Sequence, residues 1–104
     1  MYCLIYITCS KVDEAKNISR NLLEKELIAC ANIFPNIESI YTWQNKIVED
    51  SEVVLIVKSK KELFSFIKEE VLLLHTYSNP CVVQLDITHG QEKYLKWIDV
   101  NCRN

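Results

Sequence analysis

The sequence predicts an α+β fold of the ferredoxin-like type, a βαββαβ sandwich with one antiparallel sheet and both helices on one side. Three observations predict it. Four segments are rich in β-branched and aromatic residues, two segments between them carry apolar residues at helical spacing, and a tight turn joins the two middle strands. Two βαβ units that share a central hairpin give the expected strand order 4-1-3-2, followed here by an extra C-terminal helix.

A strand and a helix open the chain. Residues 2–9 (YCLIYITC) are β-branched and aromatic, which is typical of a strand. Ser10 and Asp13 have the spacing of a capping box, which predicts the start of a helix. We expect this helix to end near Leu27. Its apolar stripe is formed by Ala15, Ile18 and Leu22.

The two middle strands form a long hairpin. Residues 28–43 predict a strand that is interrupted at Pro35, because proline cannot donate to a ladder; this indicates a bulge or an edge strand. Asn45 tolerates positive φ and predicts a sharp turn. The strand that follows, over residues 46–58, contains the apolar run VVLIV at 53–57.

A second helix, a short strand and a final helix complete the predicted fold. Ser59 and Glu62 repeat the capping-box spacing ahead of the second helix. That helix has an apolar stripe of Leu63, Phe66, Ile67, Val71 and Leu74. Residues 81–88 predict a strand, and Thr88 with Gln91 predicts the cap of the last helix. The last helix carries Tyr94, Leu95, Ile98 and Cys102.

Length and composition restrict the class of protein. The 104 residues predict a single domain, 1–104, and a hydrophobic content of 49% is enough for a core. The net charge of −2 and the absence of a basic block argue against nucleic acid and membrane as partners. The N-terminal stretch lacks the positive region and cleavage site of a secretory signal, so we expect a cytoplasmic protein. Its five cysteines, with no Cys-x-x-Cys, are expected to be free thiols.

Both faces of the predicted sheet are apolar, because neither residues 2–7 nor residues 53–57 alternate between apolar and polar. One chain has too little helix to cover both faces. We therefore expect further copies of the chain to cover the second face. Tyr41 and Trp43, next to the hairpin turn, are expected to anchor this assembly, since both residue types are enriched in interface cores.

Cys9, His75 and Cys81 form the candidate metal-ligand cluster. Strands one and four are predicted neighbours, so the end of the first lies near the start of the fourth, with His75 in the adjoining loop. Thiolate and imidazole suit Cu(I) or Zn. The alternative is that both cysteines are small buried hydrophobic residues.

Glu52 and Lys58 flank the apolar run of the third strand. A charge at such a position marks either a strand end that reaches water or a functional cleft. The functional interpretation is a cleft at a subunit interface, where these two residues meet Tyr77.

Several motifs together resemble the CutA family of divalent-cation tolerance proteins. They occur in the order and spacing of the family and extend from the first strand to Trp97. They are ACAN at 29–32, YTWQNK at 41–46, Glu52, Lys58, HTYSNP at 75–80 and THGQEKYLKW at 88–97.

The resemblance implies a homotrimer similar in architecture to the PII signalling proteins, with a hairpin that reaches the next subunit. It implies a link to copper and other divalent metals, with no established enzymatic activity and no required cofactor. It also favours the interface cleft of Glu52, Lys58 and Tyr77. A strand-one cysteine that has been proposed as a metal ligand in the family aligns with Ile7, two residues before Cys9.

We therefore expect a non-enzymatic CutA-like homotrimer that is associated with copper tolerance or binding. The alternative is a PII-like signalling trimer that binds a small ligand at its interface clefts, although the long mobile loop of PII proteins is replaced here by a tight turn. An RNA-recognition module needs stacking aromatic residues on strand three, which EVVLIVKS lacks. A small hydrolase is disfavoured because no Ser/His/Asp or Cys/His arrangement has convincing spacing.

Overall fold

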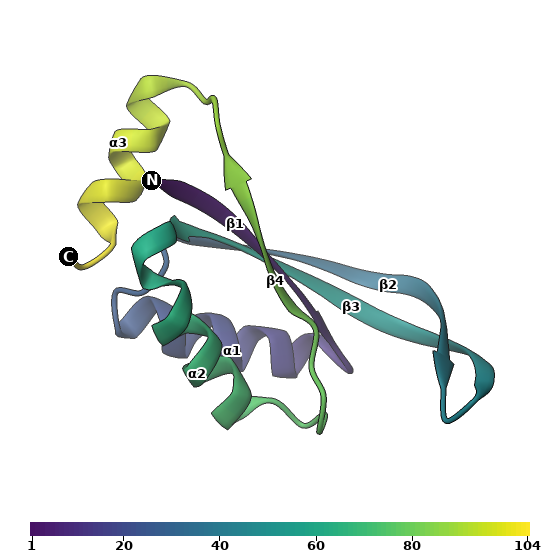
Figure 1. The fold of residues 1–104 in the computed structure, drawn as a ribbon. Helices are drawn as coiled ribbons and strands as arrows, with labels where there is room; N and C mark the ends of the chain where they lie inside the picture. The colour runs from purple at the N-terminus through teal and green to yellow at the C-terminus, as the bar shows by residue number, and fades with distance from the viewer.

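The computed structural model describes all 104 residues. The elements follow the order β1 (Tyr2–Cys9), α1 (Val12–Glu24), β2 (Cys30–Trp43), β3 (Lys46–Lys60), α2 (Phe64–Leu74), β4 (Val82–Ile87) and α3 (Glu92–Asn101), shown in Figure 1. All pairings are antiparallel and the strand order is β2-β3-β1-β4. This is the predicted order 4-1-3-2 read from the other edge, so the ferredoxin-like prediction is confirmed. No helix is both long enough and apolar enough to cross a membrane.

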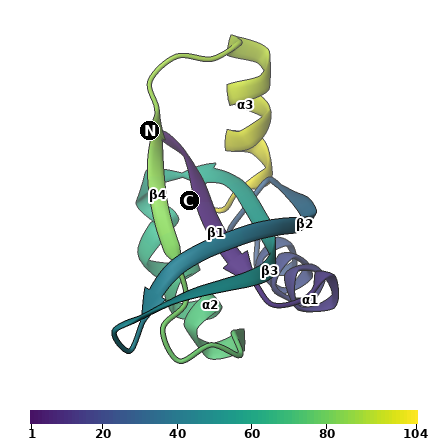
Figure 2. The ribbon, with the colours of Figure 1, turned by 90° about the vertical axis from the view of Figure 1, so that its right-hand side faces the viewer.

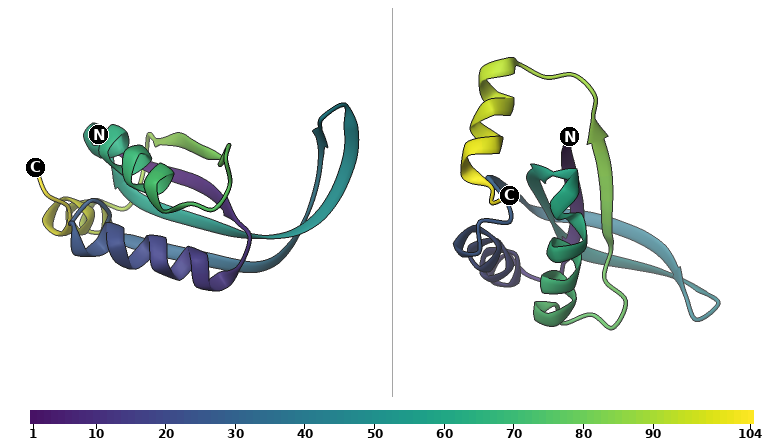
Figure 3. Two further views of the ribbon diagram at one scale, coloured as in Figure 1. Left: turned by 90° about the horizontal axis from the view of Figure 1, so that it is seen from below. Right: turned by 60° about the vertical axis from the view of Figure 1, so that its left-hand side comes forward.

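Helices α1 and α2 lie side by side on one face of the sheet (Figure 3). Alternate residues of β1 point toward them and are completely buried, namely Cys3, Ile5, Ile7 and Cys9. Leu55 and Val57 of β3 face the same side and are also completely buried. These side chains and the apolar stripes of the helices form one core of 18 buried residues, which includes Ile98 of α3.

The opposite face of the sheet, here called the open face, stays uncovered at its centre. The intervening residues of β1 lie on it, and the register pairs Leu4 with Leu85 and Tyr6 with Val83. Val83 and Leu85 are 49% and 52% exposed. The prediction that both faces carry apolar side chains is therefore confirmed, and a single chain leaves part of the second face exposed.

The β2–β3 hairpin projects from the body of the molecule (Figure 1), and in Figure 2 it comes toward the viewer. Pairing continues to Trp43 and Lys46, so that Gln44 and Asn45 form a two-residue turn, with φ of 50° and 64°. Positive φ at both positions is characteristic of the type I′ turn, whose twist matches the flanking strands. The register shifts between Phe34 and Ile37, and β2 is an edge strand. The predicted turn and interruption are both confirmed.

The starts of all three helices differ from the prediction. The N-cap of α1 is Lys11, and Ser10 instead donates its amide and hydroxyl to Glu14 Oε1. The predicted pairing of Ser10 with Asp13 is wrong, because Glu14 lies one residue further on and turns back toward Ser10. The helix ends at Glu24 rather than near Leu27.

The second predicted cap is also wrong. Strand β3 continues to Lys60 and leads into a 3₁₀ turn, Lys61–Leu63, before α2 begins. The hydroxyl of Ser59 is buried and donates to the carbonyl oxygen of Leu27 at 2.6 Å. A tertiary hydrogen bond has replaced the local cap. In α3 the cap is Gln91 rather than Thr88, and its side chain accepts from the amide of Tyr94 at 3.0 Å.

Candidate functional site

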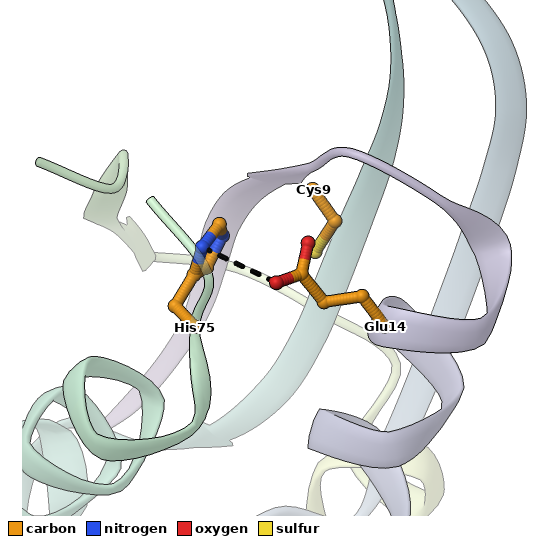
Figure 4. Close-up of side chains that lie close together, drawn as sticks. All are labelled: Cys9, Glu14 and His75. Carbon is orange, nitrogen blue, oxygen red and sulfur yellow. Dashed lines mark ion pairs between the residues drawn. The ribbon is translucent and has the colours of Figure 1, made fainter. Parts of the chain in front are cut away.

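The candidate metal centre is a cluster of Cys9, Glu14 and His75 (Figure 4). Cys9 ends β1, Glu14 lies in the first turn of α1, and His75 follows α2 directly. Their potential ligand atoms all lie within 4.8 Å of one another. The side chains of Cys9 and His75 are completely buried. The structure thus brings together two of the three predicted metal-ligating residues and adds Glu14.

Cys81, the third predicted ligand, does not join this cluster. The register pairs Ile7 with Val82, which places Cys81 opposite Thr8 on the open face of the sheet. Its thiol is 3.9 Å from the carbonyl oxygen of Tyr6. The predicted proximity of the two thiols is wrong because successive strand residues point to opposite faces. Cys9 has entered the core and Cys81 has not.

Hydrogen bonds connect the cluster to the loop after α2. The amide of Thr76 donates to Glu14 Oε2 at 2.7 Å. The amide of Tyr77 donates to His75 Nδ1 at 3.1 Å, which assigns the ring proton to Nε2. His75 Nε2 then donates to the carbonyl oxygen of Thr8 at 2.8 Å. Every polar atom of the cluster that is buried has a partner.

The electrostatics of the cluster keep its thiol protonated. Burial, followed by the charges of Glu14 and Glu52, raises the pKa of Cys9 to about 12. Partial burial acts to raise the pKa of Glu14, but hydrogen bonds from Ser10 and Thr76 and the nearby His75 outweigh it, and the pKa is lowered. A metal bound here would displace the thiol proton and the Tyr77 amide.

A groove of about 580 Å³ lies between the hairpin and the loop before β4. It contains five of the predicted site residues: Tyr41, Trp43, Glu52, Tyr77 and Cys81. Its other lining residues are Thr8, Ser39, Ile40, Thr42, Asp50, Ser78 and Asn79. Tyr77 donates its hydroxyl to Glu52 at 2.7 Å. The hairpin aromatics therefore border the same hollow as this hydrogen-bonded pair.

The groove is acidic, with two carboxylates and no basic side chain among its lining residues. Tyr41 donates its hydroxyl to Asp50 at 3.4 Å. Burial, and then hydrogen bonding and charge from Glu52, raise the pKa of Tyr77. Burial and the charge of Asp50 likewise raise the pKa of Tyr41. The groove consequently favours a cationic or neutral occupant.

Lys58 lies away from the groove. It is six residues from Glu52 on the same strand, a distance of about 20 Å at roughly 3.3 Å per residue. Its ammonium group donates to the hydroxyl of Tyr94 at 3.0 Å. The three residues of the predicted cleft therefore do not meet within one chain: Glu52 and Tyr77 are in contact, and Lys58 is not.

Sequence reasoning missed Glu14 and Asp50 as site residues and placed Tyr94 only on the last helix, without a role. The spacing of Glu14, four residues after Ser10, is the one local signal that would have identified it. Asp50 and Tyr94 give no local signal, because the first lies across the hairpin from Tyr41 and the second meets Lys58 from α3.

These features define a small ferredoxin-like protein with an uncovered apolar sheet face, a projecting aromatic hairpin and a buried thiol–carboxylate–imidazole cluster. The family model described as CutA1 divalent ion tolerance protein matches residues 3–101. The chain belongs to the CutA family.

Relatives from distant organisms agree with this assignment. The divalent-cation tolerance protein CutA of Archaeoglobus fulgidus is 42% identical over 95% of this chain and 96% of its own. The chloroplastic protein CutA of Arabidopsis thaliana is 38% identical over 97% of this chain and 56% of its own. The solved structure of the divalent cation tolerance protein of Thermus thermophilus, 40% identical, superposes with a TM-score of 0.96 over 99% of this chain and 100% of its own.

Proposed function

We propose that this protein is a homotrimer that acts in divalent-cation tolerance by binding copper or a similar metal, without catalysing a reaction. Family membership supports the tolerance role. The observation that carries the trimer is the open face, where the apolar side chains of Phe34 in β2 and of Val83 and Leu85 in β4 stay about half exposed in a single chain. Apolar patches of this kind mark association surfaces.

The projecting hairpin supports the same assembly. The hairpin extends beyond the body of the chain (Figure 1), and it carries Tyr41 and Trp43 next to its turn, where a neighbouring subunit can cover them. In such a trimer Lys58 of one subunit would face the Glu52–Tyr77 pair of the next, since the three residues are too far apart to meet within one chain. Opposite charges would favour this arrangement.

The Cys9–Glu14–His75 cluster is the proposed metal centre. A thiolate, an imidazole and a carboxylate form a donor set that suits copper or zinc. Because the thiol must lose its proton to bind, the apparent affinity is expected to fall as the pH falls. His75 would bind through Nδ1, which its present tautomer leaves without a proton.

Native mass spectrometry of the metal-free and Cu(I)-loaded protein tests both parts of the proposal. We expect a trimer mass with one copper per chain, lost in Cys9→Ser and retained in the matched control Cys81→Ser. Circular dichroism verifies that both variants fold. A stable monomer at micromolar concentration contradicts the trimer, and equal copper loss in both variants contradicts the metal centre.

The groove supports a second candidate function, a PII-like trimer that binds a small ligand at its subunit clefts. Its volume of about 580 Å³ falls in the range of small-molecule sites. The two functions differ in the residue they require. Loss of ligand binding in Glu52→Gln with copper binding unchanged would favour the second.

A further inference from the structure

Tyr77 connects the Cys9–Glu14–His75 cluster to the groove. Its amide donates to His75 Nδ1 at 3.1 Å. Its ring lies against the imidazole, with the two ring centroids 4.7 Å apart and the planes tilted by 45°. Its hydroxyl donates to Glu52 Oε2 at 2.7 Å, and both residues line the groove. One residue therefore forms a hydrogen bond at each site, the first through its backbone and the second through the tip of its side chain.

The Nδ1 atom of His75 can hold only one partner at a time. Nε2 lies 2.8 Å from the carbonyl oxygen of Thr8 and therefore carries the ring proton, which leaves Nδ1 with a single lone pair. The amide of Tyr77 occupies that lone pair. A metal ion bound to Nδ1 would use the same lone pair at about 2.0–2.1 Å. The Tyr77 amide and a metal ion consequently exclude each other.

Glu14 does not impose the same choice on its partner in the loop. Its Oε2 accepts the amide of Thr76 at 2.7 Å and lies 3.6 Å from His75 Nδ1. A carboxylate oxygen has two lone pairs, so it can accept this amide and bind a metal ion at the same time. Thr76 can therefore stay in place when a metal binds, whereas the next residue, Tyr77, must move.

Movement of the Tyr77 amide also affects the bond to Glu52. The aromatic ring is rigid, so its hydroxyl follows the backbone, and an O–H···O bond leaves its usual range once it exceeds about 3.0 Å. Glu52 is held in β3, where it is paired with Ile37 of β2, and does not follow the loop. Thr76 and Ser78, on either side of Tyr77, are exposed, so the loop can shift without loss of core packing.

We propose that metal binding at the Cys9–Glu14–His75 cluster releases Tyr77 from Glu52, and that the groove thereby responds to occupancy of the buried centre. This inference rests on the metal centre proposed above and adds a regulatory link to it. The two states differ in the partner of His75 Nδ1, which is the Tyr77 amide without metal and the metal ion with it. Because coupling between two sites is reciprocal, a change that removes the Tyr77–Glu52 bond strengthens metal binding.

The zinc affinity of the native, full-length protein tests this link. Zn²⁺ is a suitable probe because thiolate, imidazole and carboxylate all bind it and it has no redox chemistry. Isothermal titration compares the parent with Tyr77→Phe, which keeps the ring and removes the hydroxyl. We expect Tyr77→Phe to bind zinc about two- to fivefold more tightly, the factor that corresponds to the net contribution of one partly exposed hydrogen bond. The matched control Tyr41→Phe removes a groove hydroxyl that is bonded to Asp50 instead, and should leave the zinc affinity unchanged.

Amide hydrogen exchange followed by NMR gives a second measurement with an internal control. Addition of Zn²⁺ is expected to accelerate exchange of the Tyr77 amide, which loses its acceptor. The adjacent Thr76 amide should stay protected, because Glu14 remains its acceptor. Cys9→Ser should abolish both zinc binding and the change at Tyr77.

The outcomes separate the link from the metal centre. If zinc binding is lost in Cys9→Ser but is equally strong in the parent and Tyr77→Phe, the link is overturned and the centre stands. A Tyr77 amide that stays protected with zinc bound, or an equal gain of affinity in Tyr41→Phe, overturns the link in the same way. A parent that binds no zinc, or that binds it no better than Cys9→Ser, refutes the metal centre and the link with it.

Discussion

The two faces of the sheet are built from the same strands but differ in what covers them. On the helix face, Ile5 and Ile7 are completely buried by elements of their own chain. On the open face, Val83 and Leu85 remain about half exposed. Because the stabilisation by apolar burial scales with the area removed from water, the helix face supplies folding energy in a single chain. The open face can supply comparable energy only through association.

The open face also has two unlike ends. One end carries the carboxylates of Asp50 and Glu52 beside the groove. The other carries Lys58 with Tyr94 and Cys30. The side chains that the strands bury on the helix face are almost all apolar. The open face therefore differs from it in carrying charged groups of opposite sign at its two ends.

The largest effect that separates association from folding is expected for Trp43→Ala. Trp43 is 48% exposed in one chain, so its loss changes the isolated fold little. In an assembly that buries it, removal of the ring costs about 3–5 kcal/mol. Sedimentation should show a weakened trimer, while Ile47→Ala, at a hairpin residue that is 79% exposed, serves as the control. A Trp43→Ala trimer as heat-resistant as the parent would refute the anchor role.

One substitution on each face of the sheet tests whether the two faces differ in what buries them. Ile7→Ala removes a completely buried side chain from the helix face and is expected to cost about 2–5 kcal/mol at any protein concentration. Leu85→Ala on the open face is expected to lower the free energy of unfolding more at high protein concentration, because Leu85 is buried only when the chains associate. Urea unfolding over a range of protein concentrations measures both. If the Leu85→Ala effect does not change with concentration, the open face is not an association surface.

Acidification tests the Glu14 network. A carboxylate whose pKa is lowered in the folded state stabilises that state above its unfolded pKa, and this contribution is lost as the pH falls through the folded pKa. Glu14→Gln should remove this part of the acid dependence and cost about 1.5–3 kcal/mol near neutral pH, the range for hydrogen bonds to charged groups. Thermal unfolding of the parent and the variant, followed from neutral pH into the acid range, measures both the acid dependence and the loss of stability. An unchanged acid slope would show that Glu14 is not the group responsible.

The smallest effect is expected for Tyr77→Phe in the groove. The variant keeps the ring and removes the hydroxyl that donates to Glu52 at 2.7 Å. The site is partly exposed, so the expected loss is below about 1 kcal/mol. Tyr41→Phe, whose hydroxyl is 3.4 Å from Asp50, is a matched variant and should change the stability less. The reverse order in thermal unfolding would contradict the assigned hydrogen bonds.

The sequence by itself determined the elements whose signals are local and repeated. Segments rich in β-branched and aromatic residues predicted all four strands, and helical spacing predicted the three helices. Asn45 predicted the turn because few residues tolerate positive φ, and Pro35 predicted the interruption of β2 because it lacks an amide hydrogen. Each of these signals acts through backbone sterics or periodic burial, which do not depend on distant residues.

Only the tertiary structure decided which side chains meet. Ser59 lost its predicted capping role because a carbonyl of Leu27, far away in the sequence, offered its hydroxyl a buried partner. Cys9 and Cys81 were separated by the register of β1 against β4, since a shift of one residue exchanges the faces of a strand. Glu14 and Tyr94 entered their clusters through contacts between separate elements. Pairings of this kind depend on the register of the sheet and on helix docking, and neither is encoded in the local spacing of residues.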